Sequence, residues 1–92
     1  MQVSIPKTFK LGGRTWRVKR VGKRKWYGKT DPNICVIELS ASCTHDELEQ
    51  QTFLHELLHA VAITMGWSRL NNDEDKIDAV AGLLLQALTT AK

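Results

Sequence analysis

Segment 44–66 constrains the fold more than any other part of the sequence, because it places two histidines and a glutamate in an otherwise apolar helix. Its apolar side chains fill roughly 160° to 340° of a helical wheel measured from His55, as in a helix packed on several neighbours. His59 lies one turn after His55, and Glu56 lies beside the first histidine. Burying these three groups without partners would cost several kcal/mol. A bound dication with an activated water removes that cost, so the segment predicts a metal site.

The five residues His55-Glu56-Leu57-Leu58-His59 have the spacing H-E-x-x-H. Positions i and i+4 lie about 6 Å apart on one helix face, so both imidazoles can reach one tetrahedral ion. The carboxylate that follows the first histidine can take a proton from a water held at the open coordination position. We therefore expect His55 and His59 to be metal ligands and Glu56 to be a catalytic base. The alternative is a pair of core histidines bonded to backbone carbonyls.

Two histidines alone make a weak zinc site, so a third protein ligand is expected. The acidic start of the next helix offers Glu74, which shares the inward helix face with Ile77. Asp78 follows one turn later and can orient a ligating histidine as a hydrogen-bond acceptor. The alternative role for both acids is stabilisation of the helix N-terminus through the helix dipole. His45 precedes His55 by about 15 Å along the helix and cannot share the ion.

The first third of the chain predicts strands. Gly12-Gly13 is a two-residue turn signal for a basic hairpin within residues 1–21, with Phe9 opposite Trp16 in the register. Residues 34–39 predict a third strand at an edge, after a connector rich in glycine and lysine. We therefore expect a three-stranded, mainly antiparallel sheet.

The second half predicts two helices. Thr44 and Glu47 have the spacing of a capping box at the start of helix 44–66, and Gly66 is suited to end it. A second helix is expected over 72–90, with side-chain oxygens before it as caps. The 92 residues then form one α+β domain, in which the sheet packs on the first helix and the second helix supplies the third ligand.

The formal net charge of +3 conceals a strong asymmetry. Residues 1–30 hold ten lysines and arginines and no acid, whereas residues 31–92 hold three bases and ten acids, so the two parts carry +10 and −7. The parts can attract each other within the fold, or the basic third can bind nucleic acid. Trp26 and Tyr27, which stand between lysines, are candidate base-stacking residues.

Several protein classes are excluded by composition. The chain has no run of 18 apolar residues that would span a membrane, and its first residues lack the apolar core of a secretory signal. Cys35 and Cys43 do not make a disulfide framework and have no C-x-x-C neighbour, so neither is expected to bind metal. These features predict a soluble, cytoplasmic protein.

Residues 52–60, together with 74–81, resemble the gluzincin metallopeptidases and are most similar to small phage and prophage proteins related to the ImmA/IrrE group. The resemblance covers about residues 26–88. It implies a minimal zincin-like fold, Zn²⁺ held by the two histidines and Glu74, and Glu56 as general base. It also implies a protein or peptide substrate, cleaved in the bacterial host cytoplasm.

The same resemblance bears on substrate binding. The segment 27–31 looks like the approach to the family's substrate-binding edge strand, which is expected at 34–39, so Tyr27 and Ile37 are candidate substrate contacts. Tyr27, Arg69 and His45 are candidate donors to the oxyanion that forms during peptide hydrolysis. Two other functions stay open: a basic nucleic-acid-binding module, and a metal-stabilised interaction protein without catalysis.

Overall fold

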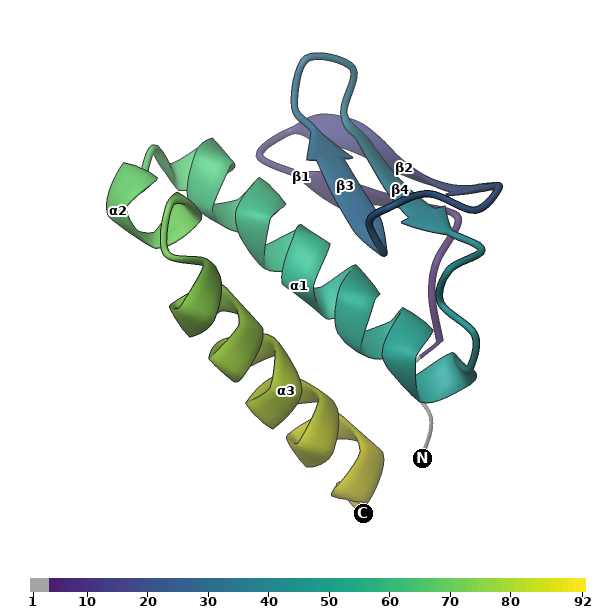
Figure 1. The fold of residues 1–92 in the computed structure, drawn as a ribbon. Helices are drawn as coiled ribbons and strands as arrows, with labels where there is room; N and C mark the ends of the chain where they lie inside the picture. Colours follow the sequence, from purple (N-terminus) through teal and green to yellow (C-terminus); the bar gives the residue numbers. More distant parts are fainter. Residues whose placement is uncertain (1–3) are drawn as a thin grey trace.

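The computed structural model describes residues 4–92 and has a four-stranded sheet with its helices on one side. The elements are β1 (Thr8–Leu11), β2 (Arg14–Val21), β3 (Gly28–Asp31), β4 (Val36–Ser40), α1 (Asp46–Met65), α2 (Ser68–Asn71) and α3 (Glu74–Thr90). Figure 1 shows α1 crossing the sheet and α3 running beside α1, so that α1 lies between the sheet and α3. The expected α+β class is confirmed.

The β1–β2 hairpin has the predicted register. Phe9 pairs with Trp16 in an antiparallel ladder, and their rings stack with centroids 6.1 Å apart. Gly12 and Gly13 have φ values of 60° and 79°, which is the left-handed conformation that a two-residue turn of this type requires. The first three residues of the predicted hairpin range 1–21 lie outside the described residues.

The sheet differs from the expected one in strand number and direction. Its order is β1-β2-β4-β3, with β2 and β4 parallel and the other two pairs antiparallel. The expectation of three mainly antiparallel strands was therefore wrong. Residues 22–33, read as a connector, contain β3, so the chain reverses twice before β4 and β4 returns in the direction of β2.

The segment 34–39 is not an edge strand, because β4 pairs with β2 on one side and β3 on the other. Ile37, at the centre of this strand, is fully buried and belongs to the core with Leu39 and Trp16. It therefore cannot contact a substrate at the surface, and its predicted role is wrong. The strand at this edge of the sheet is β3, which follows β4 in the strand order.

Both long helices begin with a side-chain cap. The N-cap of α1 is His45, whose Nδ1 accepts a hydrogen bond from the backbone N–H of Leu48 (3.2 Å), so the predicted box on Thr44 was one residue early. Gly66 ends α1 with φ 69°, as predicted. Asp73 caps α3 by accepting from the backbone N–H of Lys76 (3.0 Å). Among the described residues, no helix is long and apolar enough to cross a membrane.

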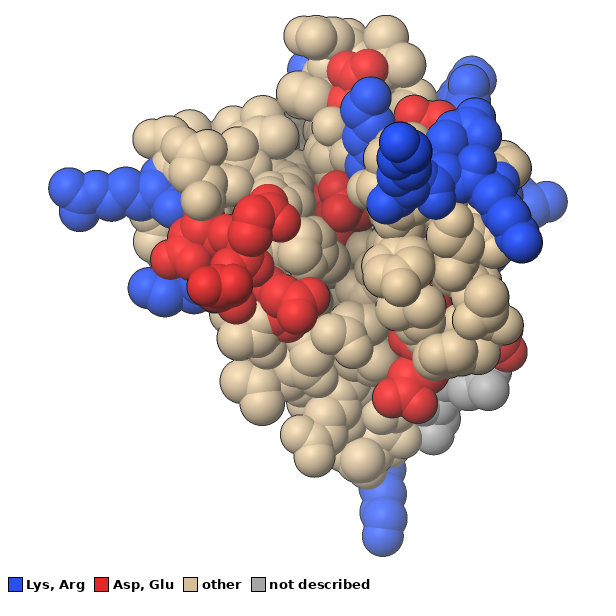
Figure 2. All heavy atoms as spheres, in the orientation of Figure 1, with Lys and Arg blue, Asp and Glu red and all other residues tan. Residues whose placement is uncertain are grey.

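In the described part of the chain, one surface ion pair joins the two oppositely charged parts. Arg20 on β2 donates through Nε and Nη2 to the Glu49 carboxylate of α1, at 3.2 and 3.0 Å. This hydrogen bond, with the negative charge of Glu49, raises the pKa of Arg20 above its usual value. Elsewhere the charges stay apart: Figure 2 shows basic side chains over β3 and the loop before it, and acidic side chains over the start of α3.

Candidate metal centre

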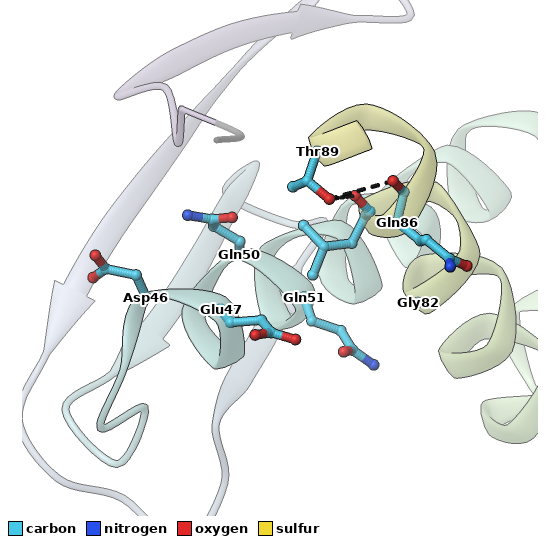
Figure 3. A pocket seen from close by; sticks show the side chains of 8 residues that line it. Asp46, Glu47, Gln50, Gln51, Gly82, Gln86 and Thr89 are labelled. Atoms are coloured by element: carbon cyan, nitrogen blue, oxygen red, sulfur yellow. Dashed lines mark hydrogen bonds between the residues drawn. The ribbon is translucent and has the colours of Figure 1, made fainter. Parts of the chain in front are cut away.

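One groove of the helical layer lies away from the predicted metal ligands. It lies between the start of α1 and the end of α3, where Gln50 and Gln51 face Gln86 and Thr89, with Asp46 and Glu47 at its rim (Figure 3). No histidine or cysteine lines it, so it offers only amide, hydroxyl and carboxylate oxygens.

A second groove lies between β3, α1 and α3. It consists of two adjoining pockets that share Gly28 of β3, Glu56 of α1 and Glu74 of α3. In Figure 2 it is the hollow between the acidic start of α3 and the basic loop before β3, with acidic atoms inside it. Both histidines of the H-E-x-x-H sequence also line this groove.

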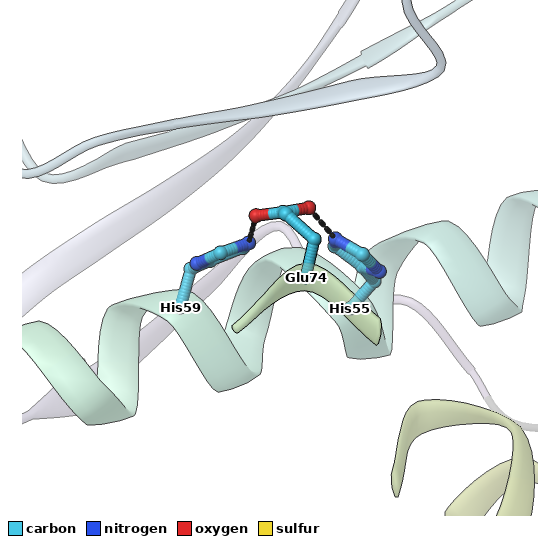
Figure 4. A group of neighbouring side chains, drawn as sticks. All are labelled: His55, His59 and Glu74. Atoms are coloured by element: carbon cyan, nitrogen blue, oxygen red, sulfur yellow. Dashed lines mark hydrogen bonds and ion pairs between the residues drawn. The ribbon is translucent and has the colours of Figure 1, made fainter. Parts of the chain in front are cut away.

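The groove brings together the three residues that were predicted as metal ligands. His55 and His59 project from one face of α1 with ring centroids 5.1 Å apart, and Glu74 is the first residue of α3 (Figure 4). The Glu74 carboxylate lies 3.1 Å from His55 Nε2 and 2.7 Å from His59 Nε2. One ligand atom from each residue lies within 4.8 Å of the others. This group could therefore hold a metal ion.

Each histidine is also held from behind through its second ring nitrogen. Asp78 Oδ1 lies 3.2 Å from His55 Nδ1, in the position predicted from helical spacing. Asn71 Oδ1 lies 2.8 Å from His59 Nδ1, a contact that the sequence analysis missed. The only sequence signal for Asn71 was its place before an acidic helix start, which we interpreted as capping. These contacts fix the rings with Nε2 toward Glu74.

The hydrogen-bond geometry at His55 is compatible with a bound cation. Carboxylates accept hydrogen bonds and do not donate them, and a neutral imidazole carries one N–H. His55 faces the Asp78 carboxylate with Nδ1 and the Glu74 carboxylate with Nε2. If Nδ1–H donates to Asp78, then Nε2 points its lone pair at Glu74. A cation bound between them would pair with both the lone pair and the carboxylate.

Glu56 is buried beside the cluster and is held by β3. Its side chain is 11% exposed, and its Oε2 lies 3.9 Å from His55 Nε2. The hydroxyl of Thr30 lies 2.8 Å from Glu56 Oε1 and 3.0 Å from the Glu56 backbone oxygen, so its single hydrogen is shared between these two acceptors, of which Oε1 is the nearer. Thr30 thus fixes one carboxylate oxygen and leaves Oε2 toward the histidines. The sequence analysis missed Thr30 because β3 was not expected.

Gly28 allows this close approach of β3 to α1. A Cβ atom at position 28 would lie 2.6 Å from Thr52 Cγ2 and 2.9 Å from Glu56 Cγ. Because side-chain carbon atoms do not approach so closely, any other residue there would move the strand or the glutamate. Gly28 and Thr30 lie on the same face of β3 and together form the socket around Glu56.

Replacement of Thr30 tests this socket. We expect Thr30→Val to lower the free energy of unfolding by about 1–3 kcal/mol, because it leaves a buried carboxylate oxygen without its donor. Thr30→Ser keeps the hydroxyl and should recover most of that loss. Urea titration followed by circular dichroism measures both variants. Equal stabilities for the valine and serine variants would show that the hydroxyl does not hold Glu56.

Of the other candidate site residues, Tyr27 lies in the groove, whereas His45 and the two cysteines play other parts in the structure. Tyr27 lines the groove and is 53% exposed, so it remains a candidate for contact with substrate. His45 caps α1 and does not line the groove, which removes it as an oxyanion donor there. Cys35 is buried, and Cys43 Sγ lies near the Tyr27 carbonyl oxygen (3.6 Å); neither belongs to the metal-ligand group.

Comparison of the chain with protein-family models, curated proteins and solved structures finds no match. The resemblance to the gluzincins therefore stays a prediction that rests on the H-E-x-x-H residues and Glu74. What the site can do has to be argued from the side chains of this chain.

Proposed function

We propose that this protein is a zinc-dependent peptidase that hydrolyses a peptide bond in the groove between β3, α1 and α3. The observation that carries the proposal is the convergence of His55, His59 and Glu74 on one point, with the buried Glu56 carboxylate beside them. A cluster that only stabilised the fold would not need a second carboxylate held at that point by its own hydrogen bond.

The ligand chemistry favours zinc among the divalent cations. Two imidazoles and one carboxylate form a three-ligand set that is typical of catalytic zinc sites with an open fourth position. The Glu74 side chain is 66% exposed, so the cluster opens to the groove. When bound, zinc acts as a Lewis acid on a carbonyl oxygen and makes water nucleophilic at neutral pH.

Glu56 would carry out both proton transfers of the reaction, and Asp78 and Asn71 would orient the histidines. Glu56 Oε1 is occupied by the Thr30 hydroxyl, so Oε2 is the oxygen that takes a proton from the attacking water. As the water oxygen bonds to the carbonyl carbon and the C–N bond breaks, Glu56 passes the proton to the leaving amine. Asp78 and Asn71 keep the two imidazoles oriented throughout.

The exposed edge of β3 supports an extended peptide as substrate. Among residues 4–92, β3 pairs with β4 alone, so its second edge is available to an added strand, which would bind through main-chain hydrogen bonds. This edge carries the socket of Glu56, so a strand added there would run past the proposed ligands. The edge of β3 thus takes the substrate-binding role that was expected for the strand at 34–39. Tyr27, just before β3, would contact the same strand.

Metal analysis of the purified protein tests the proposal. We expect about one zinc per chain. Loss of a residue that hydrogen-bonds to a metal ligand lowers metal affinity by roughly 10–100-fold, and His59→Ala removes a proposed ligand itself, so its zinc affinity should fall by more than that. His45→Asn is the matched control: it also removes an imidazole, but asparagine retains the helix cap. Elemental analysis and competition with a chromophoric chelator give the stoichiometry and affinity. Equal zinc affinities in the two variants would refute the ligand assignment.

A further inference from the structure

The face of the sheet turned away from α1 carries more positive than negative side chains. Phe9, Trp16 and Val18 point toward the helices. Because successive side chains of a strand point to opposite faces, the residues directly before and after them in the sequence lie on the outer face. The register puts Lys19 opposite Glu38, and Glu38 opposite Lys29. We define the basic face as the exposed residues of this surface that carry a positive charge: Lys10, Arg17, Lys19 and Lys29.

These charges are only partly offset within the fold: Glu38 lies between Lys19 and Lys29, and Asp31 shares a row with Arg17, so the four cations and two carboxylates leave a net +2 (4 − 2). Among residues 4–92, the ion pairs of lysines and arginines join Arg20 to Glu49 and Lys76 to Asp73, and none includes a residue of the basic face. The loop after β2 adds Lys23, Arg24 and Lys25, which are also exposed. The predicted attraction between the two charged parts of the chain is thus limited to Arg20, and the basic face remains available to an outside partner.

We propose that the basic face binds the phosphate backbone of double-stranded DNA without reading its sequence. Alternate residues of one strand lie about 6.8 Å apart, and Lys19 and Lys29 lie two strand spacings apart, about 9.6 Å. The four cations outnumber the carboxylates Glu38 and Asp31 on this face, and this excess of positive charge suits a duplex that carries one negative charge per about 1.7 Å of its axis. Charge complementarity therefore favours a densely charged polyanion over a partner with scattered acidic groups.

The side chains around these cations limit the kind of contact. Phe9 and Trp16 point inward and pack on the core. Of the two candidate base-stacking residues, Tyr27 lines the groove on the helical side and Trp26 is half-buried in the loop before β3, so neither belongs to the basic face. Thr8 and Thr15, which share the outer face, are small and polar. The exposed large apolar residues of the described chain lie outside β1 and β2, so this part of the face offers no anchor for insertion into a membrane. Binding through phosphates alone fits these side chains.

This surface is separate from the proposed peptidase groove except at Lys29, which also lines the groove. Lys10, Arg17 and Lys19 are not among the residues that line it. DNA binding therefore goes beyond the proposed function and does not depend on it. Its test uses the intact chain and needs no hydrolysis.

Fluorescence anisotropy with a labelled DNA duplex of about 20 base pairs tests the proposal. If about four phosphates are contacted, the logarithm of the affinity falls with the logarithm of the salt concentration with a slope of about −3.6, or about a hundred-fold between 50 and 200 mM. Arg17→Gln/Lys19→Gln should lower the affinity at low salt by about ten-fold and the steepness of the slope by about two. Lys10→Gln/Lys29→Gln, which removes one charge from β1 and one from β3, should lower the affinity and the slope by similar amounts.

The matched control is Arg69→Gln/Lys76→Gln, which lies on α2 and α3. Both Arg17→Gln/Lys19→Gln and this control reduce the formal net charge from +3 to +1 (3 − 2), so they differ only in where the charge is removed. The control should change the affinity less than about two-fold. An equal loss in both variants, or no binding by the unmodified chain at 50 mM salt, would overturn the proposal. Displacement of DNA by an equal charge of polyglutamate would identify an acidic protein as the partner and also overturn it.

Discussion

Glu56→Gln lowers the rate of peptide cleavage by about 10²–10⁴-fold and leaves zinc in place, which is the result we expect if Glu56 is the base. Glutamine has the shape of glutamate and retains an oxygen for the Thr30 hydroxyl, so the socket stays filled. It cannot accept a proton from water at the other side-chain atom. Since Glu56 is not among the three proposed ligands, the zinc content should match that of the unmodified protein.

The measurement combines zinc analysis with the appearance of new amino termini in a mixture of unstructured peptides. Glu47→Gln is the matched control, because it makes the same chemical change on an exposed residue of the same helix. Cleavage by the Glu56 variant within about three-fold of the control would exclude Glu56 as base. Zinc binding without cleavage by the unmodified chain would favour the non-catalytic, metal-stabilised interpretation.

Ile37→Ala is expected to lower the free energy of unfolding by about 2–5 kcal/mol, because it removes a fully buried side chain from the centre of the sheet. Ile37→Val should cost only about 0.5–1.5 kcal/mol. A loss of this size is a large fraction of the stability of a small domain. Ile37 would thus influence activity through folding and not through contact with substrate.

Ile34→Ala provides the comparison, since Ile34 is 65% exposed and comes just before β4. We expect a change within about 0.5 kcal/mol for this variant. Urea titration of the three variants at equal zinc content gives the free energies. If Ile37→Ala were no more destabilising than Ile34→Ala, then β4 would not be the central strand described above.

The local parts of the site were predictable because they depend on spacing along one helix. His55, Glu56 and His59 are fixed by the pitch of α1, and Glu74 and Asp78 by the inward face of α3. Their convergence needed only two helices packed side by side. The expected hairpin was predictable for a similar reason, since a glycine pair sets both the turn and the register.

The missed parts depend on contacts between distant segments. Gly-Lys-Thr-Asp has no apolar alternation, and β3 becomes a strand by pairing with β4, so Gly28 and Thr30 could not be placed at Glu56. The role of Asn71 depends on the short helix α2, which turns it toward His59. Ile37 was assigned to substrate contact because its strand was expected at the edge of the sheet, whereas β4 lies between β2 and β3. The apolar run 34–37 indicated a strand that is covered on both sides.

The parallel ladder between β2 and β4 has a consequence for the order in which the molecule assembles. β1–β2 and β3–β4 are neighbours in sequence and can each form early, whereas joining them closes a longer loop and should come late. The proposed ligands His55, His59 and Glu74 all lie on the consecutive segment α1–α3, outside that slow step. If they hold zinc as proposed, the helical pair binds it before the strand that carries Thr30 arrives, and metal uptake precedes the proposed activity during refolding.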